Sequence, residues 1–128
     1  MAIGFSDSVA KFARDAEQAE TDVLHHALRG LDQAIVDKTP VVTGNLKNSR
    51  TVSTLGPPTI DWKVKKFRDP DDAINNAVAG VEPGQTTWLG FRAPYAHKIE
   101  PERGMLRLAA QRWQQIVADA VRAVRGGR

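Results

Sequence analysis

Residues 6–38, SDSVAKFARDAEQAETDVLHHALRGLDQAIVDK, form the longest stretch of the sequence with one regular pattern. Apolar residues recur in it in steps of three and four, which aligns them along one face of a helix. They are Val9, Phe12, Ala16, Ala19, Val23, Ala27, Leu31 and Ala34 or Ile35. Pro40 disfavours helical angles at Thr39, so we expect the helix to end near Lys38. A helix this long overhangs the core of a small domain, and we expect one end to pack against another subunit.

Shorter elements are expected after this helix. Residues 50–55, 60–65 and 86–91 are rich in β-branched and aromatic residues or alternate apolar with polar ones, as strands do. In the second of these strands Lys63 and Lys65 fall on the polar side, a placement typical of an edge strand. Asp69 and Pro70 are a helix-start signal, and a short helix is expected to follow and to end at Gly80.

A second long helix is expected near the C-terminus. Residues 93–100 fit a helical turn and a strand equally well. Gly104 then precedes apolar residues at helical spacing from Leu106 to Val124. The order of elements predicts an α+β fold, in which a small antiparallel sheet packs against the long N-terminal helix and the C-terminal helix. We expect a single domain over residues 1–128, with frayed ends at 1–5 and 125–128.

The composition excludes several kinds of site. The chain has 128 residues, 41% of them apolar and 26% charged, with no cysteine and a formal net charge of +3. Without cysteine there is no disulfide, thiol nucleophile or thiolate metal ligand. The sequence contains no glycine-rich phosphate-binding loop, and its histidines lack the spacing of metal ligands. His25 and His26 are adjacent and point apart on a helix, so we expect one to be partly buried and the other solvated.

The acidic residues do not form a recognisable catalytic group. Asp69, Asp71 and Asp72 are explained by capping of the short helix. Glu100 and Glu102 flank Pro101 and fit a surface turn better than a pair of catalytic carboxylates. We therefore expect no enzymatic activity, no metal and no cofactor.

Two clusters of basic residues are the remaining candidates for a binding site. Arg103 and Arg107 are four residues apart and are expected to share a helix face. Lys63 and Lys65 belong to a second cluster near the middle of the chain. Such clusters can follow a phosphate backbone, and the alternative is a solvated helix face with a basic tail.

Two segments together resemble a known family. Residues 39–49, TPVVTGNLKNS, are similar to the Thr-Pro-Val-Asp-Thr-Gly-Arg-Leu-Arg-x-Ser motif of tailed-phage neck and tail-completion proteins, the gene-ten-like tail components. Residues 94–100, PYAHKIE, and 104–107, GMLR, resemble the family's Pro-Tyr-Ala-x-x-x-Glu segment and the Gly-Met-Val-Arg that opens its last helix. The chain departs from the family at Val42, in place of Asp, at Asn45, in place of Arg, and in a shorter stretch after Glu100.

The resemblance implies a structural virion protein and no chemistry. Such proteins form rings, with a hexamer favoured, around the DNA channel at the head–tail junction. The implied partners are further copies of the chain, the neighbouring head–tail connector and tail proteins, and the packaged DNA, with no membrane involved. The implied location is the neck or tail of a virion assembled in the host cytoplasm. The alternatives are a tail terminator ring one layer further down and a small basic DNA-binding protein.

The resemblance and the local patterns together give hypotheses for individual residues. Within the first motif (Thr39, Pro40, Thr43, Gly44 and Leu46), Thr43 is expected to cap a brief helical turn and Gly44 to support a tight turn. The candidate interface residues are Tyr95, Glu100, Gly104 and Arg107, with Glu100 pairing with an arginine such as Arg107 within or across subunits. The candidate DNA-channel residues are Arg103, Arg107, Lys63 and Lys65.

Overall fold

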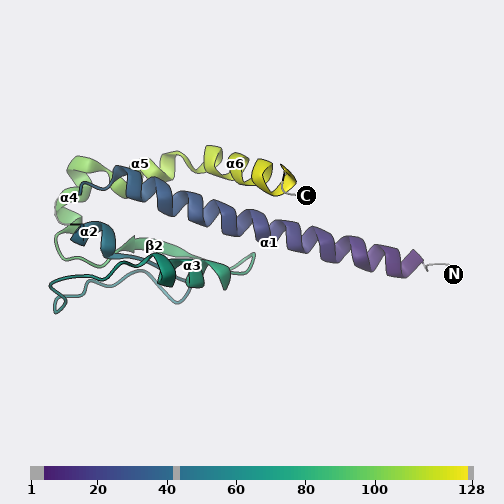
Figure 1. Cartoon of the computed structure of the whole chain (residues 1–128), viewed down its shortest axis with the longest axis horizontal. Coiled ribbons are helices and arrows are strands. Elements are labelled where there is room, and N and C mark those ends of the chain that lie inside the picture. The colour runs from purple at the N-terminus through teal and green to yellow at the C-terminus, as the bar shows by residue number, and fades with distance from the viewer. Residues whose placement is uncertain (1–4, 42–43, 127–128) are drawn as a thin grey trace.

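The first helix is the longest element of the structure, and the other elements pack around its C-terminal half (Figure 1). The computed structural model describes residues 5–41 and 44–126. Helix α1 (Phe5–Lys38) has 34 residues, which corresponds to about 50 Å at ~1.5 Å per residue. It ends where the sequence predicts. The Thr39 hydroxyl donates to the Ile35 carbonyl at 2.6 Å and closes the last turn before Pro40.

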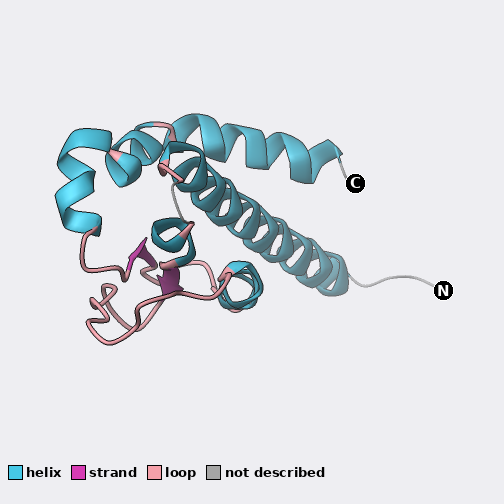
Figure 2. Cartoon of the chain, turned by 60° about the vertical axis from the view of Figure 1, so that its left-hand side comes forward, coloured by secondary structure: helices cyan, strands magenta, loops and turns pink. Residues whose placement is uncertain are grey.

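Two layers flank α1 (Figures 1 and 2). One layer is formed by α4 (Ala96–Arg103), α5 (Met105–Gln111) and α6 (Trp113–Gly126), with α6 running along α1. The approach of α6 is close at Gly30, where an added Cβ would lie 2.9 Å from Cγ2 of Ile116. This contact explains a glycine in the middle of a long helix, where it would otherwise cost about 1 kcal/mol relative to alanine.

The second layer contains the sheet. Strands β1 (Arg50–Ser53) and β2 (Trp88–Phe91) pair antiparallel, with Arg50 opposite Phe91 and Ser53 opposite Trp88. The short helix α2 (Asn45–Asn48) precedes β1, and α3 (Asp71–Ala79) lies between the strands in sequence. The expected α+β fold, with a small antiparallel sheet, a long N-terminal helix and helices at the C-terminus, is confirmed, and the C-terminal helices pack on α1.

Apolar residues of α1 pack against both layers. Its residues Ala27, Ala34 and Ile35 join a buried cluster with the C-terminal helices; the remaining members are Leu46, Phe91, Ala93, Met105, Ala109, Ile116 and Ala120. Leu28, one position further around the helix, belongs instead to a cluster with Val52, Ile74, Val78 and Val81 from the sheet layer. One helix therefore holds the two layers together by burying apolar area on both sides.

The expected strand over residues 60–65 is wrong. The Asp61 carboxylate accepts the backbone N–H groups of Lys63 and Val64, at 3.0 and 3.1 Å, and these bonds turn the chain. They also lower the pKa of Asp61, with the Lys63 N–H as the larger cause. Residues 54–70 thus form an irregular loop, and Lys63 and Lys65 lie in it rather than on an edge strand.

The C-terminal region also differs from expectation. The single helix expected after Gly104 is two helices, with a break at Arg112, where the sequence has neither proline nor glycine to mark it. The ambiguous residues 93–100 lead into α4, and the strands are shorter than predicted at 50–53 and 88–91. Of the ends expected to fray, Phe5 lies in α1, and Arg125 and Gly126 lie in α6; residues 1–4 and 127–128 are outside the described residues. In the described residues, none of the helices combines the length and apolar character required to cross a membrane.

A buried guanidinium joins four elements. Arg50 opens β1, and its side chain is 4% exposed. Its Nη1 donates to the Asp32 carboxylate of α1 at 2.5 Å and its Nη2 to the Asp71 carboxylate of α3 at 2.7 Å. Its Nε donates to the Lys47 carbonyl of α2 at 2.8 Å. Each nitrogen has a partner, as a buried charge requires.

Truncation of this arginine tests how much the fold depends on it. We expect Arg50→Ala to lower the free energy of unfolding by about 3 kcal/mol or more, because the largely buried Asp32 carboxylate loses its cation. Arg92→Ala is the matched control. Its guanidinium is 43% exposed and lies 3.5 Å from Asp61, so we expect a loss below about 1 kcal/mol. Chemical denaturation at neutral pH measures both, and equal losses would contradict a special role for Arg50.

Candidate functional site

The two motif segments meet at the C-terminal end of α1. Leu46 of the first segment lies in one buried cluster with Ala93 and Met105. Ala93 immediately precedes the second segment, and Met105 belongs to it. At the surface above this cluster, Asn45 Nδ2 donates to the Tyr95 hydroxyl at 3.3 Å. Residues 39–49 and 94–107, which are about fifty positions apart in the sequence, therefore meet where α1, α2, α4 and α5 come together. We call this region the motif joint.

The first motif builds the corner between α1 and β1. Thr39 is buried and closes α1, and Leu46 anchors α2 in the core. Gly44 precedes α2 with φ of 79°, a left-handed conformation that favours glycine, as the expected tight turn requires. Its carbonyl accepts the N–H of Asn48 at 2.9 Å. Pro40 lies between these residues and is half-buried, and the capping role expected for Thr43 falls outside the described residues.

Asn45 has a role that sequence reasoning missed. Its Oδ1 accepts the backbone N–H of Phe67 at 2.7 Å, while its Nδ2 reaches Tyr95. The side chain thus ties the end of the irregular loop to both motif segments. The only signal in the sequence was the departure from the family pattern, in which an arginine occupies this place.

Glu100 caps a helix instead of pairing with an arginine. Both of its carboxylate oxygens accept the backbone N–H of Leu106, at 3.1 and 3.0 Å, and Oε1 also accepts that of Arg107 at 3.0 Å. These N–H groups belong to the first turn of α5 and have no partner within the helix. Within the chain, the Glu100 carboxylate is bonded to the backbone N–H of Arg107, and no Glu100–Arg107 salt bridge joins their side chains in the described residues; its pairing with an arginine across subunits stays a prediction.

Gly104 makes the turn that allows this cap. It is buried between α4 and α5 with φ of 62°, again left-handed. An added Cβ would lie 2.6 Å from Nη2 of Arg107 and 3.2 Å from Cγ of Leu108. Its N–H donates to the Glu100 carbonyl and its carbonyl accepts from Leu108, both at 2.7 Å. Gly104 is therefore a structural residue of the corner.

The candidate interface residue Tyr95 lies at the surface. Its side chain is 37% exposed, and its hydroxyl accepts the Asn45 bond. The side chain is therefore not packed in the core, where aromatic residues are usually expected. An exposed aromatic ring beside a hydrogen-bonded hydroxyl can take part in a protein contact.

The basic candidates lie in three different elements of the structure. Arg103 lies in the last turn of α4 and Arg107 in α5, so the expected shared helix face is wrong, because Gly104 turns the chain between them. Both are exposed. Lys63 and Lys65 are exposed in the β1–α3 loop.

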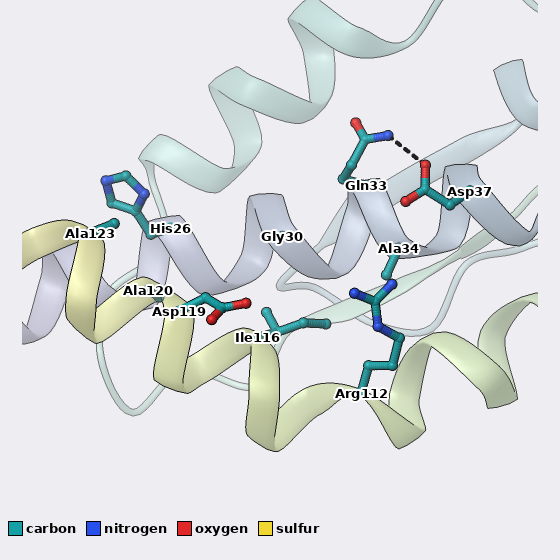
Figure 3. Close-up of a pocket in the computed structure, with 10 residues that line it drawn as sticks. All are labelled: His26, Gly30, Gln33, Ala34, Asp37, Arg112, Ile116, Asp119, Ala120 and Ala123. Atoms are coloured by element: carbon teal, nitrogen blue, oxygen red, sulfur yellow. Dashed lines mark hydrogen bonds between the residues drawn. The ribbon is translucent and has the colours of Figure 1, made fainter.

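A groove of about 320 Å³, lined by apolar and charged side chains, lies between α1 and α6 (Figure 3). In it, Gln33 donates to Asp37 at 2.9 Å, and the Arg112 side chain extends from the α5–α6 break toward α1. Asp119 accepts from Gln115 at 2.8 Å and from Arg122, and both contacts lower its pKa, that of Gln115 first.

The histidines behave as expected. His25 is partly buried, with Nε2 2.8 Å from the Val81 carbonyl, and His26 is exposed. Across residues 5–41 and 44–126, no three histidine, aspartate or glutamate side chains gather closely enough to hold a metal ion.

Comparisons with known proteins give no assignment. No protein-family model matches the chain, and no curated protein or solved structure matches it either.

The Glu100 cap gives a direct test of the corner. We expect Glu100→Ala to lower the free energy of unfolding by about 1–2 kcal/mol, since N–H groups of α5 lose their acceptors. Arg107→Ala distinguishes a cap from an ion pair and is expected to cost less than about 0.5 kcal/mol. Thermal or urea unfolding reports both. Equal destabilisation by the two substitutions would favour a side-chain ion pair and overturn the cap.

Gly104 provides a second test. We expect Gly104→Ala to cost about 1–2 kcal/mol, because a Cβ is unfavourable in the left-handed region. Gly80→Ala serves as control, since Gly80 has φ of −90° and no atom closer than 3.6 Å to an added Cβ. We expect that variant to be neutral or slightly stabilised. If both variants unfold at the same denaturant concentration, the φ of Gly104 has no energetic role.

Proposed function

We propose that this chain is a structural subunit of the head–tail junction of a tailed phage or phage-like particle, acting in a ring around the DNA channel. The observation that carries the proposal is the motif joint. The two segments that resemble the neck and tail-completion family contribute Leu46 and Met105 to one buried cluster and are linked by the Asn45–Tyr95 hydrogen bond. The two segments that resemble one family thus lie together in the fold, although they are far apart in the sequence.

The exposed part of α1 supports assembly with other subunits. All residues from 10 to 18 whose side chains the structure describes are exposed, and this half of α1 extends beyond both layers (Figures 1 and 2). A helix of this kind without tertiary packing is only marginally stable in water. A neighbouring subunit that covers the exposed segment would stabilise it. Such a contact would also explain why α1 is longer than the core of one subunit requires.

The proposal requires no reaction from the chain. Of the charged side chains in the groove between α1 and α6, Asp119 is paired with Arg122, which lies outside the lining. The partners are further copies of the chain, the adjoining connector and tail proteins, and DNA that passes without tight binding. A tail terminator ring remains the alternative within this class, and the position of the chain in the particle distinguishes the two.

The mass of the assembled protein tests the proposal. We expect the purified chain either to form a discrete ring or to be a monomer that joins particles lacking a finished neck in a fixed number of copies. Native mass spectrometry measures the free protein, and quantitative protein analysis of reisolated particles measures the bound copies. Particles with a finished neck are the control and are expected to take up none.

The opposite result is equally clear. A monomer that ignores unfinished particles but binds duplex DNA, with affinity falling steeply as salt rises, would overturn the ring proposal in favour of a small DNA-binding protein.

A further inference from the structure

The β1–α3 loop (residues 54–70) presents apolar and basic side chains together. Trp62 is 75% exposed and Leu55 98%, although large apolar side chains are usually buried. The loop's cations are Lys63, Lys65, Lys66 and Arg68. Within residues 5–41 and 44–126, no acidic side chain forms a salt bridge with any of the three lysines.

The loop is anchored on both sides of Trp62. Pro58 packs on Gly90 of β2, where an added Cβ would lie 2.9 Å from its ring, and the Asp61 N–H donates to the Arg92 carbonyl at 2.9 Å. On the other side, the Phe67 N–H is held by Asn45. The segment between these anchors is turned by the Asp61 carboxylate, so the indole and lysines are presented at the surface of a fixed loop.

A groove of about 570 Å³ with the opposite charge lies elsewhere on the chain. It runs between α1 and the turn that follows α3, and we call it the α1–α3 groove. Glu17, Glu20 and Glu82 supply its carboxylates, and the apolar part of its lining includes Ala79 and Pro83. All five of these residues are exposed. The groove has the size of pockets that enclose a bulky side chain or small ligand, about 300–1,000 Å³.

The loop starts beside Trp88 at the groove end of β2 and runs along the strand, so its Asp61–Lys65 part lies past the opposite end. The loop is bonded to Arg92, just after the strand, whereas the groove is formed by the turn before it, near the His25–Val81 contact. In Figure 1 the later part of the loop accordingly lies at the α4 end of the sheet layer, and the turn before β2 lies near the middle of α1. One chain therefore cannot easily fill its own groove with its own loop.

We propose that the β1–α3 loop of one copy docks into the α1–α3 groove of the next copy, with Trp62 on the apolar lining and Lys63 and Lys65 facing Glu17 and Glu20. The inference rests on the proposed ring and names the surfaces that form it. A contact between two different patches is heterologous and, when repeated with closure, generates a ring. Complementary charge also aligns the partners and suppresses wrong pairings.

Charge disfavours a competing contact between the acidic stretches of two α1 helices, which follow Lys11 and Arg14 in the sequence. Residues 15–22 of α1 carry Asp15, Glu17, Glu20 and Asp22 and no basic residue before His25. Two such segments side by side repel each other, whereas a basic loop neutralises one of them.

A charge exchange tests the contact in the full-length protein. Lys63→Glu with Lys65→Glu, or Glu17→Lys with Glu20→Lys, is expected to weaken assembly by about tenfold or more, measured as ring formation or as copies bound to particles lacking a finished neck. The chain that carries all four substitutions is expected to regain assembly. Lys98→Glu with Arg125→Glu removes equal positive charge elsewhere and is expected to assemble normally, and circular dichroism checks that every variant is folded.

The outcomes separate the contact from the ring. If the wild-type chain assembles and both reversals assemble as well, or if the combined variant is not rescued, the docking contact is wrong while the ring stands. If the wild-type chain assembles neither alone nor on particles, both proposals fail. If it is instead a monomer whose duplex DNA binding is abolished by the lysine substitutions, the loop is a nucleic-acid site and the docking contact is overturned.

Discussion

The ion-pair network of Arg50 is the constraint on which the rest of the fold depends. The two-stranded sheet is too small to be stable by itself, and its first residue is a buried cation that must be neutralised. Asp32 and Asp71 neutralise it from α1 and α3, and the Lys47 carbonyl completes its hydrogen bonds from α2. The guanidinium thereby fixes where the sheet layer sits on α1. That position in turn sets the α1–α3 groove and the direction in which the β1–α3 loop leaves the sheet.

Periodic and turn-forming patterns predict much of this structure, because their causes are local. The face and end of α1, the left-handed turn at Gly44 and the short helix after Pro70 follow from spacing, φ preference and proline geometry. Residues 60–65 alternate like a strand, yet a single carboxylate, that of Asp61, turns the backbone before a strand forms. The alternation of apolar and polar residues shows that a segment could have one buried face. It does not show whether a neighbouring strand is present to pair with it.

The candidate site is harder to predict because its contacts join distant residues. The sequence predicts a charged partner for Glu100, but its carboxylate accepts backbone N–H groups at the start of α5. These N–H groups are within reach because Gly104 turns the chain between α4 and α5. Asn45 acquires its role from Phe67 and Tyr95, which no local pattern connects to it. The sequence singles out Glu100 but not its partner, and it gives Asn45 no role, because tertiary structure sets the partners of both residues.

The packing of the first helix on the last one also constrains how the chain folds during synthesis. The cluster that contains Ala34 is completed by Ile116 and Ala120, near the opposite end of the sequence. A nascent chain therefore leaves the ribosome with this apolar face of the α1 segment incompletely covered until α6 emerges. Such a chain is exposed to chaperones and proteases for most of its translation. Loss of α6 by premature termination would leave that face open permanently, so truncated products are expected to be degraded rather than to compete with the complete chain.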